Sequence, residues 1–500
     1  MKKLTIYLLV LLLMLSTLTA FAGCDKADKN DANDDEEDLV EEYNFPDVER
    51  KDYGDDFNLY VAESNGGIRL WYMDDDLNRG SALDEAVYQR QERVRKHLGV
   101  EFVRVNYSDN GYNTYWKNVQ DAVQNKDGTL DALITHVHGG VSSLISENLL
   151  YNLGELEGID VDAEYWHKDF MNTLEINGEY FLGHSDYNIM VTYVIGYNKK
   201  LLDQYGAGLE KSVYDMVRDG EWTLDAMMNL AKLVYVDETG DGKSADDTFG
   251  LTASPWIAFN GFLTSSGIPM VSVNESGKYK IALNQDVYQS KANDLVEFFR
   301  NLDNAKYTYF SYSVGTVSKN PTPVALSSGR TLMNVLSTNQ LESLLDFNLE
   351  FGVLPYPLYD QNQYKSGTAD LGYKSLQWGG YLGALSYMKN PALVGETLEM
   401  LSYYSENVKI TYYEKVLGKR IADMPDDAEM LEIIWNGIST DFGQTFNDVG
   451  GNNSGVCYTV PQLMLPGNSQ NLSSYLGSRT NKVETEFEKF LDSIEKNKSK

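Results

Sequence analysis

The stretch from residue 191 to residue 205 reads Val-Thr-Tyr-Val-Ile-Gly-Tyr-Asn-Lys-Lys-Leu-Leu-Asp-Gln-Tyr. Its first part, 191–197, is rich in β-branched and aromatic residues and predicts a strand, while 199–205 has the apolar spacing of a helix. A strand followed directly by a helix is the repeating unit of a mostly parallel sheet covered by helices. The stretch therefore predicts an α/β domain. Because it lies far inside a chain of 500 residues, we expect it to begin a second domain of this kind.

The same alternation comes before this stretch. Strands are predicted over 68–72, 101–105 and 131–135, and helices over 83–98 and 112–123. Sheets of this kind bind ligands at the carboxyl ends of their strands. The loops that follow Tyr72 and Thr135 are therefore the first places to look for a site.

Further elements are predicted after residue 205. A helix is predicted over 224–234 with Thr223 as its N-cap, and a strand ended by prolines over 351–357. Additional helices are predicted over 287–302, 391–405 and 484–496.

The N-terminus has the layout of an export signal. Met1-Lys2-Lys3 precede an apolar run over 4–15, and small residues then lead to Phe21-Ala22-Gly23-Cys24. The pattern predicts a lipoprotein signal peptide over 1–23, with a lipid on Cys24 that anchors the chain to the outer face of the cytoplasmic membrane. An ordinary signal peptide or an uncleaved anchor is the alternative, although the run is shorter than the roughly 20 residues of a membrane span.

The segment 24–56 carries much of the excess acid, including Asp-Asp-Glu-Glu-Asp over 34–38. Blocks of like charge repel each other and stay extended, so the segment is predicted to be a disordered acidic tether.

Composition excludes some partners. The formal charge of -32 disfavours nucleic acid, because phosphate binding needs clustered Lys and Arg. With Cys24 lipidated, Cys457 has no cysteine partner, so no internal disulfide is expected. An apolar content of 42% supports a large core, and the length suggests two or more lobes.

Several segments carry a resemblance to a known family. They are Tyr197-Asn198-Lys199-Lys200-Leu201, the run Val-Arg-Asp-Gly-Glu-Trp-Thr-Leu-Asp over 217–225, the acidic loop from Asp237, Phe-Gly-Val-Leu-Pro-Tyr-Pro over 351–357, and Asp-Ala-Glu-Met-Leu-Glu-Ile-Ile over 427–434. In this order they resemble the extracellular solute-binding proteins of family 1, the receptors of ABC importers, from about Gly66 to the C-terminus.

The resemblance implies a type II periplasmic-binding-protein fold, in which two α/β lobes joined by a hinge close over a solute in the cleft between them. It places 57–190 and 331–380 in lobe 1, and 191–330 and 381–500 in lobe 2. It also implies delivery of the solute to the permease subunits of an ABC importer, no catalysis, and a monomer.

A sugar is the expected solute. Sugar sites combine aromatic faces with side-chain hydrogen bonds to hydroxyls, and the chain has 35 Tyr and 7 Trp. Each candidate could instead be an ordinary core residue. The candidates lie at loops or predicted lobe boundaries: Tyr72, Asp74, His136, His138, Asp186, Tyr187, Trp256, Asn260, Trp378 and Tyr381.

The loop from Asp237 matches the opening of a calcium-binding loop, with oxygen ligands at positions 1, 3 and 5 and glycine at position 6. Thr248 stands where a bidentate Glu is needed, so a solvated turn is the alternative. The candidate ligands of this structural Ca²⁺ are Asp237, Thr239, Asp241, Lys243, Asp246 and Asp247; no other cofactor is expected.

Other functions stay open. His136 and His138 would share one face of a strand, as metal ligands can, but no third ligand is evident. A receptor for peptides or a metal, a secreted carbohydrate-active enzyme and a purely structural surface protein are therefore the alternatives. The sequence shows no Gly-x-Ser-x-Gly motif and no phosphate-binding loop that would favour an enzyme.

Overall fold

The computed structural model describes residues 43–61, 82–106, 115–188, 192–274, 277–311, 326–344, 347–368, 371–377, 379–413, 425–449 and 456–498. The predicted signal peptide, Cys24 and the predicted strand over 68–72 lie outside the described residues, as do Tyr72, Asp74 and Trp378.

The first lobe is built on a four-stranded sheet with the order β13-β3-β1-β2. β1 pairs in parallel with both of its neighbours, and β13 is antiparallel to β3. β3 and β13 are buried throughout, as expected of strands covered on both faces. The strands are β1 (Asp55–Val61), β2 (Val100–Asn106), β3 (Ala132–Thr135) and β13 (Tyr381–Ala384).

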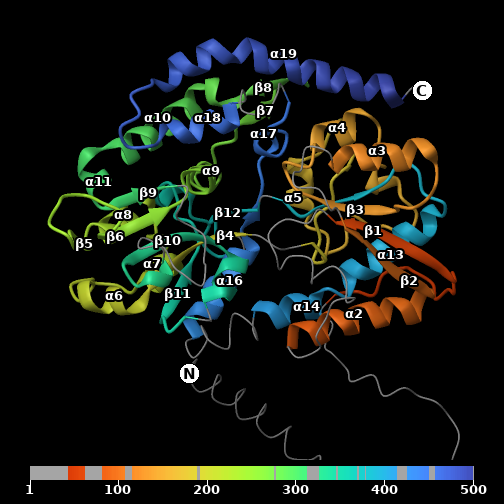
Figure 1. Cartoon of the computed structure of the whole chain (residues 1–500), viewed down its shortest axis with the longest axis horizontal. Coiled ribbons are helices and arrows are strands. Elements are labelled where there is room, and N and C mark those ends of the chain that lie inside the picture. Colours follow the sequence, from red (N-terminus) through yellow and green to blue (C-terminus); the bar gives the residue numbers. More distant parts are fainter. Residues whose placement is uncertain are drawn as a thin grey trace, which may run out of the picture. The chain divides into compact units, whose positions relative to one another are not determined.

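Helices cover this sheet (Figure 1). α2 buries an apolar stripe that includes Leu83, Val87, Val94 and Leu98, and both α13 and α14 pack against it. The helices of the first lobe are α2 (Ala82–Leu98), α3 (Tyr115–Asn125), α4 (Val141–Ser146), α5 (Lys168–Thr173), α13 (Pro391–Tyr403) and α14 (Glu406–Ile410).

The second lobe is built on a sheet with the order β11-β4-β10-β6-β5, and β9 also pairs with β6. This sheet is mixed, because β4 is antiparallel to both β10 and β11 whereas β6 is parallel to β10 and β9. The strands are β4 (Tyr193–Asn198), β5 (Tyr235–Val236), β6 (Thr248–Ala253), β9 (Thr308–Phe310), β10 (Thr331–Ser337) and β11 (Phe351–Leu354).

The remaining elements surround this second sheet or connect the lobes. The helices are α6 (Lys199–Tyr205), α7 (Val213–Arg218), α8 (Leu224–Ala231), α9 (Pro255–Ser265), α10 (Asp286–Arg300), α11 (Leu302–Lys306), α12 (Thr338–Leu344), α16 (Pro425–Asn436), α17 (Phe442–Thr445), α18 (Val456–Leu463) and α19 (Leu472–Lys498). Two short strand pairs are β7 (Val271–Val273) with β8 (Tyr279–Ile281), and β12 (Ser375–Leu376) with β14 (Ile438–Ser439).

Most of the predicted elements are confirmed to within a few residues. α6 has the predicted bounds, and Thr223 caps α8 by accepting a hydrogen bond from Ala226 N. The helix predicted over 484–496 is part of the longer α19, and the predicted strand over 351–357 ends earlier, at Leu354. β1 is a strand that the sequence analysis did not predict.

The predicted lobe boundaries after residue 330 are wrong. Segment 331–380 was assigned to the first lobe, yet β10 and β11 pair on the two sides of β4 in the second. Segment 381–500 was assigned to the second lobe, yet β13 pairs with β3 and α13 packs on α2 in the first. These boundaries came from the resemblance, and the strand patterns, which do not identify the partner of a strand, could not correct them.

The predicted tether is too long. Residues 43–56 belong to the folded body: β1 begins at Asp55, Val48 is buried, and Tyr43 donates a hydrogen bond to Asp186 Oδ2 at 3.0 Å. Lys51 Nζ pairs with Glu396 Oε1 at 2.5 Å. Specific contacts such as these hold 43–56 in the folded body, although the acidic composition of the segment predicted a disordered tether. In the described part of the chain, no helix is both long and apolar enough to span a membrane.

Candidate functional site

The backbone passes between the two sheets along neighbouring segments. Gly183 pairs with Leu382 through reciprocal backbone hydrogen bonds of 2.7 and 3.0 Å, and Thr192 forms a bridge with Gln377. Gln377 N also donates to Ser439 O at 2.8 Å, next to the β12–β14 pair. The described residues of these segments, 183–188, 192, 375–377, 379–382 and 438–441, therefore lie side by side and form the connection between the lobes.

Two buried amides hold these crossing segments together. Asn188 Nδ2 donates to Gly183 O at 3.0 Å and to Gly380 O at 2.5 Å. Gln377 Nε2 donates to Asn188 O at 3.3 Å and to Gly379 O at 3.2 Å. Because both side chains are fully buried, these bonds fix the relative positions of the crossing segments.

A charged cluster lies beside the crossing segments. Asp186, buried, accepts from Lys409 Nζ at 2.7 Å and lies 2.8 Å from His167 Nε2, and His167 Nδ1 lies 2.7 Å from His184 Nδ1. Burial alone would raise the pKa of Asp186, but Lys409 and His167 outweigh it and leave that pKa lowered. Burial, with a smaller contribution from His167, holds the pKa of His184 well below its usual value, so His184 is neutral.

Trp435, which belongs to the second lobe, lies beside this cluster. It lies near the end of α16, which packs against β11, and its ring centroid is 5.5 Å from that of His167 and 5.1 Å from that of Tyr413. Lys409 Nζ lies 4.8 Å from the centroid of the same ring. A half-buried tryptophan, hydrogen-bonding groups and the lobe connection thus meet at one place, which is the candidate solute site.

His136 and His138 follow β3, at the end of the strand where the sequence predicted a site. Their ring centroids are 5.1 Å apart, and His138 N donates to His136 Nδ1 at 3.3 Å. A Cβ at Gly379 would come within 2.7 Å of His136 Cδ2, so the ring lies directly against a crossing segment. Burial, then His138, lowers the pKa of His136 to about 3, which keeps the imidazole neutral.

The other described candidates differ in burial. Tyr187 is fully buried, with Arg90 4.9 Å from its ring centroid, and Tyr381 is fully buried with its hydroxyl 2.9 Å from Thr445 Oγ1. Both lie in the core. Trp256 is half-buried in the first turn of α9, and Asn260 lies buried one turn later, donating to Trp256 O at 2.9 Å.

The carboxylates of the loop between β5 and β6 bind the loop itself. Asp237 accepts from Gly240 N at 2.6 Å and from Gly242 N at 3.1 Å, and Thr239 donates to Asp241 at 2.5 Å. Asp246 is exposed, and Lys243 Nζ donates to Ala305 O at 2.5 Å.

Asp247 is buried in the same loop and accepts from Ser244 N at 2.8 Å and from Glu238 N at 3.2 Å. Among the described residues, no group of three or more His, Cys, Asp or Glu side chains is arranged to hold a metal. Calcium stays a prediction.

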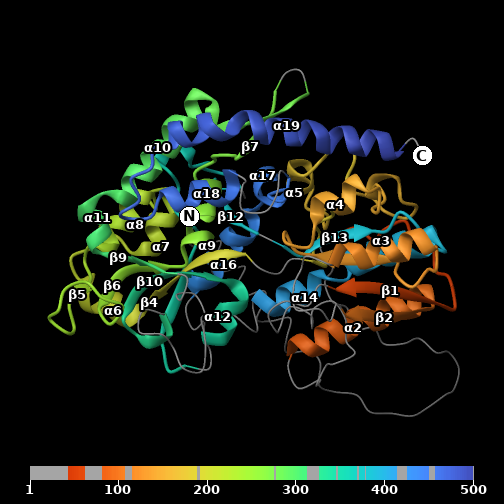
Figure 2. The ribbon, with the colours of Figure 1, turned by 45° about the horizontal axis from the view of Figure 1, so that its top comes forward.

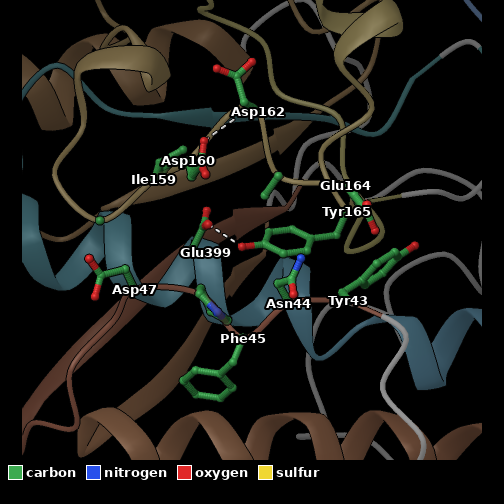
Figure 3. Close-up of a pocket in the computed structure, with 13 residues that line it drawn as sticks. Tyr43, Asn44, Phe45, Asp47, Ile159, Asp160, Asp162, Glu164, Tyr165 and Glu399 are labelled. Atoms are coloured by element: carbon green, nitrogen blue, oxygen red, sulfur yellow. Dashed lines mark hydrogen bonds between the residues drawn. The ribbon is translucent and has the colours of Figure 1, made fainter.

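Two cavities are lined by described residues outside the charged cluster around Asp186. Figure 3 shows one of about 600 Å³ that is lined by the arm 43–47, the loop 158–165 and Glu399. Glu399 accepts from Tyr165 Oη at 2.5 Å and from Trp166 Nε1 at 2.8 Å, and burial raises its pKa to about 7. A second cavity, of about 470 Å³, lies between 172–175 of the first lobe and 264–273 of the second. Neither is lined by a candidate residue from the sequence.

Residues 92–405, more than half of the chain, match the family model described as bacterial extracellular solute-binding protein. The chain belongs to this family. The match supports the resemblance seen in the sequence and agrees with two α/β sheets joined by crossing segments. A sequence search of curated proteins finds no match for this solute-binding protein.

Solved structures that match this chain include the ABC substrate-binding protein Lmo0181 from Listeria monocytogenes in complex with cycloalternan. The match has 14% identity, covers 89% of this chain and 99% of that chain, and has a TM-score of 0.46. The GacH receptor of Streptomyces glaucescens has 16% identity over 89% of this chain and 98% of its own, with a TM-score of 0.49. UgpB from Mycobacterium tuberculosis in complex with glycerophosphocholine has 15% identity, 89% and 99% coverage, and a TM-score of 0.48. At these values no residue or ligand is carried over to this solute-binding protein.

Sequence reasoning missed four residues of the candidate site in this solute-binding protein: His167, Lys409, Tyr413 and Trp435. Trp435 directly follows the family-like run 427–434, which is a signal that could have been used. His167 and Lys409 lie in segments without a family-like pattern. Only the folded chain brings them to Asp186, which the sequence did predict.

Proposed function

We propose that this solute-binding protein captures a sugar or oligosaccharide by lobe closure and delivers it to the permease of an ABC importer. The observation that carries the proposal is the meeting of Trp435 from the second lobe with His167, Lys409 and Tyr413 from the first, beside the crossing segments. A solute held there would contact both lobes, and closure of a hinge around a ligand is a common switching movement.

The chemistry of this place suits a neutral polar solute. An aromatic ring offers a face to the C–H surface of a sugar, and neutral imidazoles such as His136 can donate and accept hydrogen bonds to hydroxyls. Lys409 is already paired with Asp186, and the formal charge of -32 disfavours an anionic solute. A neutral sugar therefore fits better than a phosphate or a carboxylate.

The cellular setting is part of the proposal. The signal layout that ends at Cys24 supports a lipid anchor on the outer face of the membrane, with the acidic segment after it as a spacer. In this setting the protein works as a monomer without catalysis, and a structural Ca²⁺ in the loop from Asp237 remains the proposed cofactor. A secreted carbohydrate-active enzyme, or a receptor for peptides or a metal, is the alternative.

Thermal unfolding of the chain with Cys24→Ser, measured against monosaccharides, oligosaccharides, short peptides, Zn²⁺ and Ca²⁺, tests the proposal. A ligand that binds only the native state raises the unfolding midpoint. We expect a rise with one class of sugar and no new product by chromatography. A rise with peptides or Zn²⁺ alone would overturn the sugar assignment, and turnover of the sugar would make the protein an enzyme.

A substitution tests whether the solute binds at Trp435. Trp435→Ala should weaken the binding of the sugar found in that screen by about tenfold or more, because a central aromatic contact is lost. Tyr359→Ala is the matched control: this half-buried tyrosine has its partners, Asp294 and Lys291, in α10. Equal losses in the two variants would remove Trp435 from the site.

A further inference from the structure

The C-terminal helix α19 (Leu472–Lys498) runs across elements of both lobes (Figures 1 and 2). It packs against α18, α10 and β8 of the second lobe and against α4 of the first. Its buried side chains recur along one face over nearly its whole length: Leu472, Tyr475, Leu476, Val483, Phe487, Phe490 and Ile494. α19 is therefore a connection between the lobes in addition to the crossing segments.

The part of α19 on the second lobe is firmly attached. Glu484 accepts from Lys280 Nζ at 2.7 Å and from the backbone N of Ile281 at 3.3 Å, both in β8. The ring of Phe487 lies parallel to that of Tyr279 in the same strand, with centroids 6.0 Å apart. Buried aromatic contacts and a bond to strand backbone together fix this part of the helix.

The tip of α19 holds the first lobe through polar contacts near the surface. Asn497 Nδ2 donates to Ser146 O at 2.7 Å, and Glu495 Oε1 accepts from Asn177 Nδ2 at 3.0 Å. Lys498 Nζ pairs with Glu179. Surface contacts of this kind are each worth at most about 1 kcal/mol.

The tip also reaches a functional part of the first lobe. Ser146 is the last residue of α4, where helix carbonyls have no partner within the helix. α4 begins at Val141, directly after the loop that carries His136 and His138. The contact of Asn497 with Ser146 thus connects the second lobe with the helix that follows the His136–His138 loop.

We propose that α19 is a strap between the lobes, fixed to the second lobe and latched to the first by Asn497, Glu495 and Lys498. The physical basis is the difference between its two ends: buried aromatic contacts and a bond to strand backbone hold one, whereas at the other the buried Ile494 is followed by polar contacts near the surface. The latch limits how far the lobes open, and its release permits a wider opening. The inference does not depend on which solute binds.

Distance measurement between spin labels tests the strap directly. Lys96→Cys on α2 and Lys200→Cys on α6 place labels on exposed positions of the two lobes, in a chain with Cys24→Ser and Cys457→Ser. We expect Asn497→Ala combined with Lys498→Ala to broaden the distance distribution toward longer values. An unchanged distribution, in a variant that keeps its unfolding midpoint, would overturn the proposal.

A local measurement and a control variant distinguish loss of the latch from loss of folding. Asn497→Ala alone should speed amide exchange at the C-terminal end of α4 by about two- to tenfold, as expected for one lost hydrogen bond. Lys489→Ala is the matched control, because its ion-pair partner Glu486 lies in α19 itself. Equal effects of Lys489→Ala and Asn497→Ala on exchange or on the distances would also overturn the latch.

Discussion

Two buried carboxyl groups in the first lobe have pKa values that their surroundings shift in opposite directions. Glu399 accepts from neutral donors, among them the Tyr165 hydroxyl and the Trp166 indole, so burial dominates and its pKa rises to about 7. Asp186 is equally buried but faces Lys409 and His167, and its pKa is lowered. The charge of the neighbours, rather than burial, decides which carboxyl is ionised.

Glu399 should make the protein less stable as the pH rises. Its folded-state pKa of about 7 lies above the ordinary value of 4.5, so its stabilising contribution is complete below pH 4.5 and is lost as the pH rises through about 7. The loss amounts to about 3 kcal/mol at most. Glu399→Gln should remove this part of the pH dependence of the free energy of unfolding, measured by denaturant titration between pH 4.5 and 8.

Glu147→Gln is the control for that variant, because it makes the same chemical change at an exposed position. Parallel profiles for the parent and Glu399→Gln would show that Glu399 titrates normally in the folded chain.

Asp186→Asn should destabilise the fold by about 3 kcal/mol, because it leaves the largely buried Lys409 ammonium without its charged partner. Since the pKa of Asp186 is lowered, its contribution is present above the ordinary carboxyl pKa of about 3.9 and is lost as the pH falls below that value. Chemical denaturation at pH 7 and pH 3 measures both effects. Adding Lys409→Met should recover part of the loss at pH 7, and strictly additive losses would contradict a direct coupling of the pair.

At the scale of single elements, capping decides where several helices begin. Thr223 Oγ1 accepts from Ala226 N at the start of α8, and Ser212 and Asn198 do the same for α7 and α6. Ser254 occupies the same position before α9 but makes no side-chain capping bond there. The residue type favours a cap in every case, but only the geometry shows which side chain makes the bond.

This difference gives a matched pair of variants. Thr223→Ala should lower the free energy of unfolding by about 1 kcal/mol, because it leaves a helix N–H without its acceptor. Ser254→Ala should change it by less than half as much, since no capping bond is lost. Urea denaturation of both variants measures the difference, and equal losses would argue against capping as the cause.

At the scale of the whole molecule, excess negative charge opposes folding. The chain has 74 acidic and 42 basic residues, and many of its ion pairs are exposed. Salt weakens both the net repulsion between the acidic residues and the attraction within exposed ion pairs. Because exposed pairs contribute little to stability individually, the weakened repulsion has the larger effect on stability.

We therefore expect the unfolding midpoint to rise when NaCl is increased from about 10 mM to about 150 mM, where the Debye length falls to about 8 Å. A scan of unfolding temperature against salt measures this. A midpoint that falls with salt would mean that attractive ion pairs outweigh the net repulsion.

The local sequence was sufficient to predict the α/β class, most helices and strands, the family and part of the candidate site. Helix spacing identified α2, α6 and α10, and Thr223 was predicted correctly as a cap because both signals depend on residues within a few positions of each other. The placement of His136 at the end of β3, near the lobe connection, followed from the general position of ligands in such sheets.

Only the tertiary structure decided which strands pair and which distant side chains meet. β10 and β13 were assigned to the wrong lobes because the boundaries were taken from the family resemblance, and a strand pattern carries no information about its partner that could correct them. The arm 43–56 was taken for a tether because its contacts with Asp186 and Glu396 lie far away in the sequence. His167, Lys409 and Trp435 come together in the candidate site only because hydrogen bonds and ring contacts act between neighbours in space, whatever their separation along the chain.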